Sequence, residues 1–252
     1  MHYEADTHTH TLASGHAYNT ITEMVRAAAD KGMKMIAITD HTRGKPGWEM
    51  PGTWDDMYFR NFKVIPREIF GVRVLMGAET NIMNDGTIDL PEKVLNGLDI
   101  VIASIHKQCY ADAGIEKNTE AVLSVISNPY VDILGHPDDS NTPLDYERII
   151  ARAAETGTII EVNENSYRQP GLRANCRENM DRYLALCKEY RVPVTIGSDA
   201  HFMDMVGSHH YNEAILEEMN FPMDLVMNTS AEKLRAYLRA RKEKIEGWHG
   251  CL

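Results

Sequence analysis

The stretch Asp6-Thr7-His8-Thr9-His10-Thr11-Leu12-Ala13-Ser14-Gly15-His16 follows directly on a short N-terminal run that reads as a strand, Tyr3 to His8. Side chains two residues apart in an extended backbone point to the same face, so His8 and His10 are predicted to project together. Two neutral imidazoles placed in this way can hold one divalent metal ion. Gly15 permits a turn that returns His16 to the same cleft. Because the histidines are spaced and interleaved with threonines, the stretch predicts a metal site rather than a tag.

Six further apolar runs have the character of strands, at 34–39, 73–80, 99–106, 131–136, 158–163 and 194–198. Segments with helical periodicity alternate with them, at 20–31, 57–70, 119–127, 144–156, 174–190, 212–219 and 231–245. This alternation predicts a parallel sheet, and seven strands predict a closed or nearly closed α/β barrel. A doubly wound open sheet is the alternative, but no glycine-rich nucleotide-binding loop follows any strand.

The length and composition of the chain predict a single domain that spans residues 1–252. Hydrophobic residues make up 43% of the chain and charged residues 25%, which is enough apolar side chain for a large core. The segment 42–56 is rich in Gly, Pro and Trp and is predicted to be a long loop. Its Trp48 and Trp54 either wall a pocket or pack against the barrel.

The formal net charge of −11 argues against binding to long nucleic acids or to an anionic membrane. This net charge is still compatible with a small anionic substrate, because bound metal cations reverse the local sign of the charge. The four cysteines are scattered and read as free thiols of a reducing compartment. No apolar run approaches the ~20 residues that span a bilayer. We therefore expect a cytoplasmic protein, with the question of a homo-oligomer left open.

Potential metal ligands gather at the ends of the predicted strands, where parallel barrels carry their active sites. They are His8, His10, His16, His41, Glu79, His106, His136, Asp199 and His201. Nine such residues exceed what one ion needs, so two or three ions are predicted. The remaining histidines, His2, His209, His210 and His249, are interpreted as surface or structural residues.

Six short motifs in this order resemble the PHP (polymerase and histidinol phosphatase) family, and more closely its YcdX-like branch of stand-alone phosphatases. They are HTHT at 8–11, ITDH at 38–41, GAE at 77–79, SIH at 104–106, GHPD at 135–138 and GSDAH at 197–201. Each motif is weak alone, but the ordered set is specific. The resemblance covers about residues 3–240, nearly the whole chain.

The resemblance implies a distorted (β/α)7 barrel with a trinuclear metal centre, usually of zinc, although the donor set also suits manganese or iron. It implies phosphoester hydrolysis by a metal-bridging hydroxide, since two cations bring the pKa of a shared water toward ~7. Carried over position by position, it also implies a partition of the ligands. His8, His10, Glu79 and Asp199 hold the first ion, Glu79 bridges to a second held by His106 and His136, and His16, His41 and His201 hold the third.

Residues that contact the substrate are harder to predict. Arg173 is our candidate for gripping a phosphate, because it follows the sixth strand on the active rim and a guanidinium binds phosphate bidentately. Arg168 and Lys107 are alternatives, and each of the three could instead be a solvated surface residue. Asp6 and Asp40 adjoin the ligands and either orient an imidazole or cap a strand end.

Together these features predict a phosphatase that acts on a small phosphorylated metabolite, with Glu79, Asp199 and Arg173 in its catalytic site. An exonuclease or oligonucleotide phosphodiesterase is the first alternative. An amidohydrolase is less favoured, because that family uses a carboxylated lysine late in strand four, where this chain has His106 with Lys107 beyond it. A metal-dependent structural module is the non-enzymatic alternative, disfavoured by the complete ligand set.

Overall fold

The computed structural model describes residues 3–42, 56–168, 171 and 173–252. Its centre is a sheet of seven parallel strands, each hydrogen-bonded to the next. In order they are β1 (Ala5–Asp6), β2 (Met35–Ile38), β4 (Val72–Asn81), β5 (Ile100–Ser104), β6 (Ile133–Gly135), β7 (Ile159–Asn163) and β8 (Val194–Gly197). All seven predicted strands are present, with ends that differ by a few residues.

The first and last strands of this sheet approach each other. The segments that follow β1 and β8 form a parallel bridge between Thr9 and Ala200. Nearer to the strands themselves, the hydroxyls of Thr7 and Thr195 lie 2.9 Å apart. The sheet is therefore a nearly closed barrel, which confirms the predicted (β/α)7 architecture and rules out an open doubly wound sheet.

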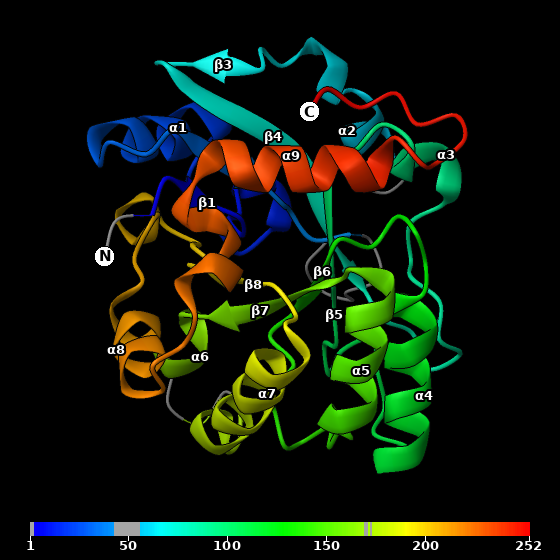
Figure 1. Ribbon diagram of the computed structural model, residues 1–252. Helices are drawn as coiled ribbons and strands as arrows, with labels where there is room; N and C mark the ends of the chain where they lie inside the picture. Colours follow the sequence, from blue (N-terminus) through cyan, green and yellow to red (C-terminus); the bar gives the residue numbers. More distant parts are fainter. Residues whose placement is uncertain (1–2, 43–55, 169–170, 172) are drawn as a thin grey trace.

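Helices connect the strands along the outside of the barrel (Figure 1). The longer ones are α1 (Ile21–Asp30), α4 (Ile115–Ile126), α5 (Tyr146–Thr156), α7 (Cys176–Tyr190), α8 (His210–Glu218) and α9 (Ala231–Lys242). Local signals place their ends: Thr20 and Glu23 form a capping box at the start of α1, and Gly157 ends α5 in a left-handed conformation. No helix in the described part of the chain is long and apolar enough to cross a membrane.

The helix predicted over 57–70 is largely wrong. Only α2 (Met57–Arg60) is α-helical there, followed by the single turn Phe62–Val64 and by the strand β3 (Glu68–Ile69). β3 pairs antiparallel with β4 through a two-residue turn in which Phe70 and Gly71 both have positive φ. Pro66 cannot donate a helical hydrogen bond, and the turn at Phe70 and Gly71 matches a hairpin geometry, so both oppose a continuous helix.

The strands bury both faces, as a parallel barrel requires. Along β5, Ile100 and Ile102 face a cluster inside the barrel, whereas Val101 packs into the layer under the outer helices. Leu234 and Leu238 of α9 belong to the inner cluster, so this helix covers one end of the barrel. Figure 1 shows α9, in orange and red, running across the strands. The opposite end, where the strands terminate, is left for the site.

A buried ion pair joins α9 to the barrel. Lys242 is fully buried, and its Nζ lies 2.7 Å from Oδ2 of Asp132, just before β6. The ammonium also donates to the carbonyl of Tyr130 at 2.8 Å, and the same Asp132 oxygen accepts from the backbone N–H of Val101 at 2.9 Å. Both charges are therefore met by partners from this chain.

Candidate metal centre

All nine predicted ligands lie at the C-terminal ends of barrel strands or in the segments that follow them. Seven are buried, and only His16 and His201 are half-buried. The structure thus brings together residues that are up to 193 positions apart, from His8 to His201. Their convergence follows from the parallel arrangement, which gathers the carboxyl ends of all strands at one rim.

Glu79, near the end of β4, lies at the centre of the cluster. Its Oε1 is 2.9 Å from Nε2 of His136 and 3.2 Å from Nε2 of His106. Its Oε2 is 2.8 Å from Nδ1 of His41. The two oxygens of one carboxylate therefore face different groups of imidazoles, which is the arrangement expected of a bridging ligand.

His8 and His10 project to the same side, as predicted, with their Nε2 atoms 3.1 Å apart. Each of these atoms is 3.4 Å from Oε2 of Glu79. Asp199 completes this side, because its Oδ1 is 3.2 Å from Nε2 of His10 and 3.8 Å from Nε2 of His8. Two imidazoles and two carboxylates from three strand ends thus surround one small space.

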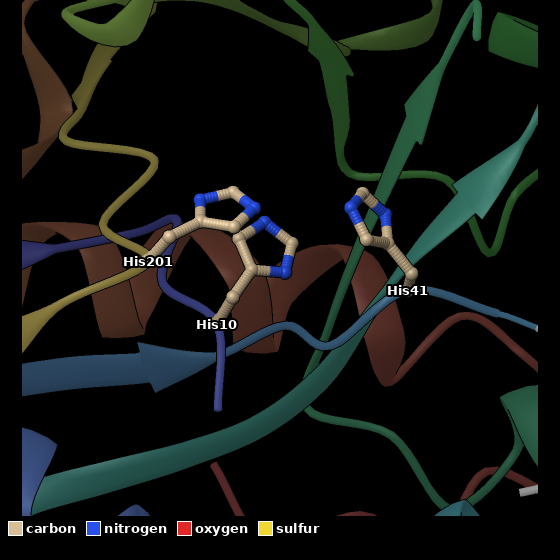
Figure 2. Close-up of side chains that lie close together, drawn as sticks. All are labelled: His10, His41 and His201. Atoms are coloured by element: carbon tan, nitrogen blue, oxygen red, sulfur yellow. The ribbon is translucent and has the colours of Figure 1, made fainter. Parts of the chain in front are cut away.

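Histidines from further segments border the same space. Nε2 of His16 and Nε2 of His201 are 2.8 Å apart. Figure 2 shows His10 and His201 side by side, with His41 facing them from another segment. Three groups have ligand atoms within 4.8 Å of one another and could each hold an ion: His10 with His41 and His201, His8 with His10 and Asp199, and His41 with Glu79 and His106.

These groups overlap, and they differ from the partition implied by the family resemblance. Geometry places His10 with His41 and His201, where the resemblance has His16 with that pair. His41 is also shared with the Glu79 group. The nine residues do converge, but their division among individual ions stays a prediction.

Neighbouring acceptors orient the imidazoles. Nδ1 of His8 is 2.6 Å from Oε1 of Glu161, and Nδ1 of His10 is 2.9 Å from the hydroxyl of Ser14. That hydroxyl donates its own proton to Oδ1 of Asp40 at 2.6 Å, so it accepts from His10. Both rings therefore carry a proton on Nδ1 and turn Nε2 toward the cluster, the tautomer that metal-binding histidines commonly adopt.

Three more rings follow the same pattern. Nδ1 of His16 donates to the carbonyl of Ser14 at 3.0 Å, and Nδ1 of His201 donates to the carbonyl of Asp199 at 2.9 Å. Nδ1 of His106 lies 2.7 Å from the amide oxygen of Asn81. In each ring the remaining nitrogen, Nε2, is left to present a lone pair.

Electrostatics in the cluster call for positive charge. Burial raises the pKa of the Glu79 carboxyl, but the surrounding imidazoles outweigh it and hold that pKa well below its usual range. The pKa of Asp199 is depressed in the same way, with His8 as the main opposing influence. Burial lowers the pKa of His10 to about 3, and nearby His201 lowers it further, so His10 is neutral. Burial opposes protonation of His8 as well, but Glu161 and Glu79 outweigh it and raise the pKa of His8 well above its usual value. Two ionised carboxylates thus lie among imidazoles of which His10 is neutral.

The residues present fit divalent metal ions. His16 and His201 both donate through Nδ1, so their Nε2 lone pairs meet at 2.8 Å, which is repulsive unless the two rings share a proton or a metal ion. Oε2 of Glu79 is buried and accepts no hydrogen bond from any described residue. Imidazole and carboxylate ligands of this kind suit zinc, manganese or iron.

Comparisons with known proteins agree with this chemistry. A model of the PHP domain matches residues 6–165, and a model described as PHP-associated matches residues 178–242. The chain belongs to the PHP family. This membership makes it a metal-dependent phosphoesterase.

Related PHP proteins extend over nearly the whole chain. A protein named probable phosphatase from Caldanaerobacter subterraneus subsp. tengcongensis is 46% identical over 250 residues, covering 96% of this chain and 93% of the relative. Another of that name, from Acetivibrio thermocellus, is 42% identical over 247 residues, covering 97% and 99%. A crystal structure of histidinol phosphate phosphatase from Lactococcus lactis, complexed with zinc, L-histidinol and phosphate, has a TM-score of 0.60 at 16% identity and covers 88% and 95%. At that identity it shows the shared fold alone.

Of the predicted phosphate-binding residues, the structure places two beside the cluster of nine candidate metal ligands. Arg173 and Lys107 line a cavity of about 450 Å³ together with five of the candidate histidines and with Glu79 and Asp199. Arg173 is largely buried; its Nη1 donates to the Ser166 hydroxyl at 2.6 Å, and its Nη2 is 3.8 Å from Oδ2 of Asp199. Arg168 does not line this cavity, and its guanidinium bonds to Ser208 instead. Trp48 and Trp54 lie outside the described residues.

The two readings of Asp6 and Asp40 can now be separated. Asp6 accepts from the backbone N–H groups of Ser198 and Gly207, at 3.2 and 2.8 Å, as a strand-end cap does. Asp40 accepts from the backbone N–H of Thr11 at 2.6 Å and reaches His10 only through Ser14. Asp6 thus caps backbone N–H groups, and Asp40 bonds Thr11, Ser14 and Tyr58.

Glu161 is the orienting residue that sequence reasoning missed. It is fully buried on β7, and besides His8 it accepts from the backbone N–H of His136 at 2.8 Å. A Cβ on Gly197 would lie 2.1 Å from Oε1 of Glu161, so a side chain at position 197 would displace the carboxylate. One charged residue inside the otherwise apolar run 159–162 was the available signal.

Proposed function

We propose that the protein is a phosphatase that hydrolyses a small phosphorylated metabolite at a centre of three metal ions, with zinc as the leading candidate. The observation that carries the proposal is the convergence of seven imidazoles and two ionised carboxylates in one cluster at the rim, beside a largely buried arginine. The structural relative that binds zinc and phosphate supports the choice of metal and of substrate group.

The ligand assignment follows the nine residues at the strand ends. Glu79 is the bridging ligand, because its two oxygens face different imidazoles. Asp199 adds the second anionic ligand beside His8 and His10. When bound, the ions lower the pKa of a water toward neutrality and offset the negative charge of the phosphoryl oxygens.

Arg173 binds the phosphate of the substrate in this scheme. Its hydrogen bonds to described residues use only Nη1, so N–H groups on Nε and Nη2 are available to the substrate. Ser166 fixes the guanidinium from behind, which keeps those groups directed without a large loss of side-chain entropy on binding. Lys107 lines the same cavity and is the second cation that could contact the ester.

The cavity volume and the charge of the whole chain favour a small substrate. About 450 Å³ is in the range of sites for small molecules. A net charge of −11 opposes a long nucleic acid, which would bring many phosphates close to an acidic surface. We propose the cytoplasm as the compartment and a free metabolite as the partner, and we leave the oligomeric state open.

Elemental analysis and a substrate panel test the proposal together. Protein purified without chelators should contain close to three transition-metal ions per chain. It should hydrolyse a phosphomonoester faster than a phosphodiester, an oligonucleotide or an amide. A metal content near zero or one contradicts the trinuclear centre. Preference for the oligonucleotide would favour a nuclease, and preference for the amide would favour an amidohydrolase.

A further inference from the structure

A second cavity adjoins the metal centre. Its volume is about 380 Å³, and it lies between the segments that follow β5 and β6. It shares four lining residues with the metal cavity, namely Ile105, Lys107, His136 and Asp139. We call it the side cavity; its own polar lining is Asp112, Asn141 and Thr142. A substrate whose phosphate lies at the metals can therefore extend into it.

Acceptors dominate the polar lining of the side cavity. Asp139 accepts three hydrogen bonds through Oδ1, from Ala174 and Asn141, whereas its Oδ2 accepts none from the described residues. Asp112 likewise uses Oδ1 for the backbone N–H of Gly114 and for Asn118. These bonds lower the pKa of Asp112, so it is ionised at neutral pH. Each carboxylate thus keeps one oxygen for a donor on a ligand.

Positive charge is scarce in this lining. Among the described residues of the side cavity the single Lys or Arg is Lys107, located where the two cavities meet. Asp112 and Asp139 therefore outnumber it, and an anionic group beyond the junction would be repelled. Hydroxyl groups would instead find acceptors on both carboxylates.

Apolar lining sets the size and shape of the ligand rather than its charge. Ile105, Pro137 and Leu144 supply aliphatic surface. Tyr110 is 4% exposed and its hydroxyl donates to Asn118, so the side cavity has no free aromatic face for a nucleobase among its described residues. A short carbon chain or a sugar ring matches this mixture of aliphatic and acceptor surface better than a nucleoside does.

We propose that the side cavity binds the alcohol part of the substrate, and that this alcohol is small, carries hydroxyl groups and has no second anionic group. The inference rests on the proposed phosphatase activity. It narrows the substrate class to phosphomonoesters of neutral polyols and sugars, and it assigns to Asp112 and Asp139 the role of excluding anionic leaving groups.

The test compares two open-chain six-carbon phosphomonoesters on the metal-loaded protein. Sorbitol 6-phosphate ends in a CH2OH group and 6-phosphogluconate ends in a carboxylate, so they differ in charge where the side cavity would hold them. We expect kcat/KM to be at least tenfold higher for sorbitol 6-phosphate. Inhibition of p-nitrophenyl phosphate hydrolysis by each compound gives the same ratio if either one turns over slowly.

Matched variants locate the discrimination. Asp112→Asn removes one negative charge from the side cavity and keeps an acceptor for Gly114, so the ratio should fall severalfold. Thr142→Lys adds a cation to the side cavity and should lower the ratio of kcat/KM for sorbitol 6-phosphate over 6-phosphogluconate further. Glu189→Gln makes the same chemical change as Asp112→Asn at an exposed residue of α7 outside both cavities, and it should leave the ratio unchanged.

Each outcome bears on a different statement. If p-nitrophenyl phosphate is hydrolysed but the wild-type ratio is near one, or if both cavity variants keep the wild-type ratio, the assignment of the side cavity is overturned and the phosphatase proposal stands. If the metal-loaded protein hydrolyses no phosphomonoester at all, the proposed function is overturned and the assignment with it.

Discussion

Buried charges occur at both ends of the barrel, and the two ends treat them differently. Under α9, Asp132 and Lys242 are fully buried and lie 2.7 Å apart; Asp132 also accepts from the backbone N–H of Val101, and Lys242 donates to the carbonyl of Tyr130. At the opposite rim, Glu79 and Asp199 are also buried, but imidazoles are the main groups around them, and one guanidinium, that of Arg173, lies 3.8 Å from Asp199. One end therefore pairs its carboxylate with an ammonium in direct contact, whereas the other leaves two carboxylates with one arginine at longer range.

The difference teaches how a structural charge can be told from a functional one. Burying a charge without a partner is unfavourable, so a stable fold supplies one, as it does for Asp132. The rim has two ionised carboxylates and one arginine near Asp199, and no lysine or arginine among the described residues is in contact with Glu79, so its partners are incomplete. The missing charge is the one that divalent ions would bring.

Acidification should have the largest effect on the site end of the barrel, where the candidate metal ligands lie. Imidazoles bind metal only when deprotonated, and an unperturbed imidazole titrates near 6.5. As the pH falls below this value, protons displace the ions, so metal content and activity should be lost together and almost completely. Activity should rise toward and above neutrality. Activity and metal content measured across pH 5 to 9 test this, and a rate optimum near pH 5 with metal retained would contradict it.

Glu79→Gln should have the next largest effect. The amide keeps the shape of the side chain but is a weaker, neutral ligand, so two ions lose their shared anion. Turnover should fall by ~10³-fold or more, which corresponds to the several kcal/mol that metal ions contribute to charge stabilisation. Metal content should fall as well. Both quantities can be measured on one preparation, and full activity in this variant would exclude Glu79 as the bridging ligand.

Lys242→Met tests the end that pairs its carboxylate with an ammonium. The change leaves Asp132 buried without its ammonium, and breaking such a pair costs ~3–5 kcal/mol of unfolding free energy. Metal content and kcat/KM of the folded protein should be unaffected. Urea unfolding followed by circular dichroism measures the loss. Adding Asp132→Asn to the same chain should recover much of it, and a loss of metal in Lys242→Met would show that the two ends are coupled.

Glu161→Gln tests whether the partner that orients His8 contributes to metal binding at the site end. The amide can still approach Nδ1 of His8 but no longer carries the charge that makes this nitrogen a strong donor. Loss of such an orienting partner typically weakens metal binding ~10–100-fold. Competition with a chromogenic chelator measures the affinity. Glu164→Gln is the matched control, because Glu164 is also buried but accepts from backbone N–H groups at the start of α8.

The convergence of the candidate ligands was predictable from the chain, because strand ends meet at one rim of a parallel barrel whatever the exact loops. An aspartate or histidine just after an apolar run is visible in the sequence, and its location at the rim follows. Glu161 was not recognised, because its contact with His8 depends on how β7 and β8 pair around Gly197. The same limit applies to the hairpin of β3, where two positive-φ residues override a helical pattern.

Substrate residues were predictable only as a choice among candidates. Arg168 and Arg173 are five positions apart in the same connection, and sequence spacing does not say which one turns inward. The structure resolves this through Ser166, whose hydroxyl holds Arg173 against the cavity, while Ser208 holds Arg168 elsewhere. Loop paths depend on such individual contacts rather than on periodicity.

Arg173→Ala should have the smallest effect of the series, and it tests the arginine that lies beside Asp199 at this rim. If Arg173 binds phosphate, its removal costs ~1.5–3 kcal/mol, the range for a hydrogen bond to a charged group, and lowers kcat/KM about tenfold or somewhat more. Metal content should be unchanged, since the ligands keep their positions. Arg168→Ala is the control and should keep wild-type kcat/KM. If Arg173→Ala behaves like wild type while the metals are bound, the phosphate must be held by the ions and Lys107, and the positive charge that matters at this rim would come almost entirely from metal.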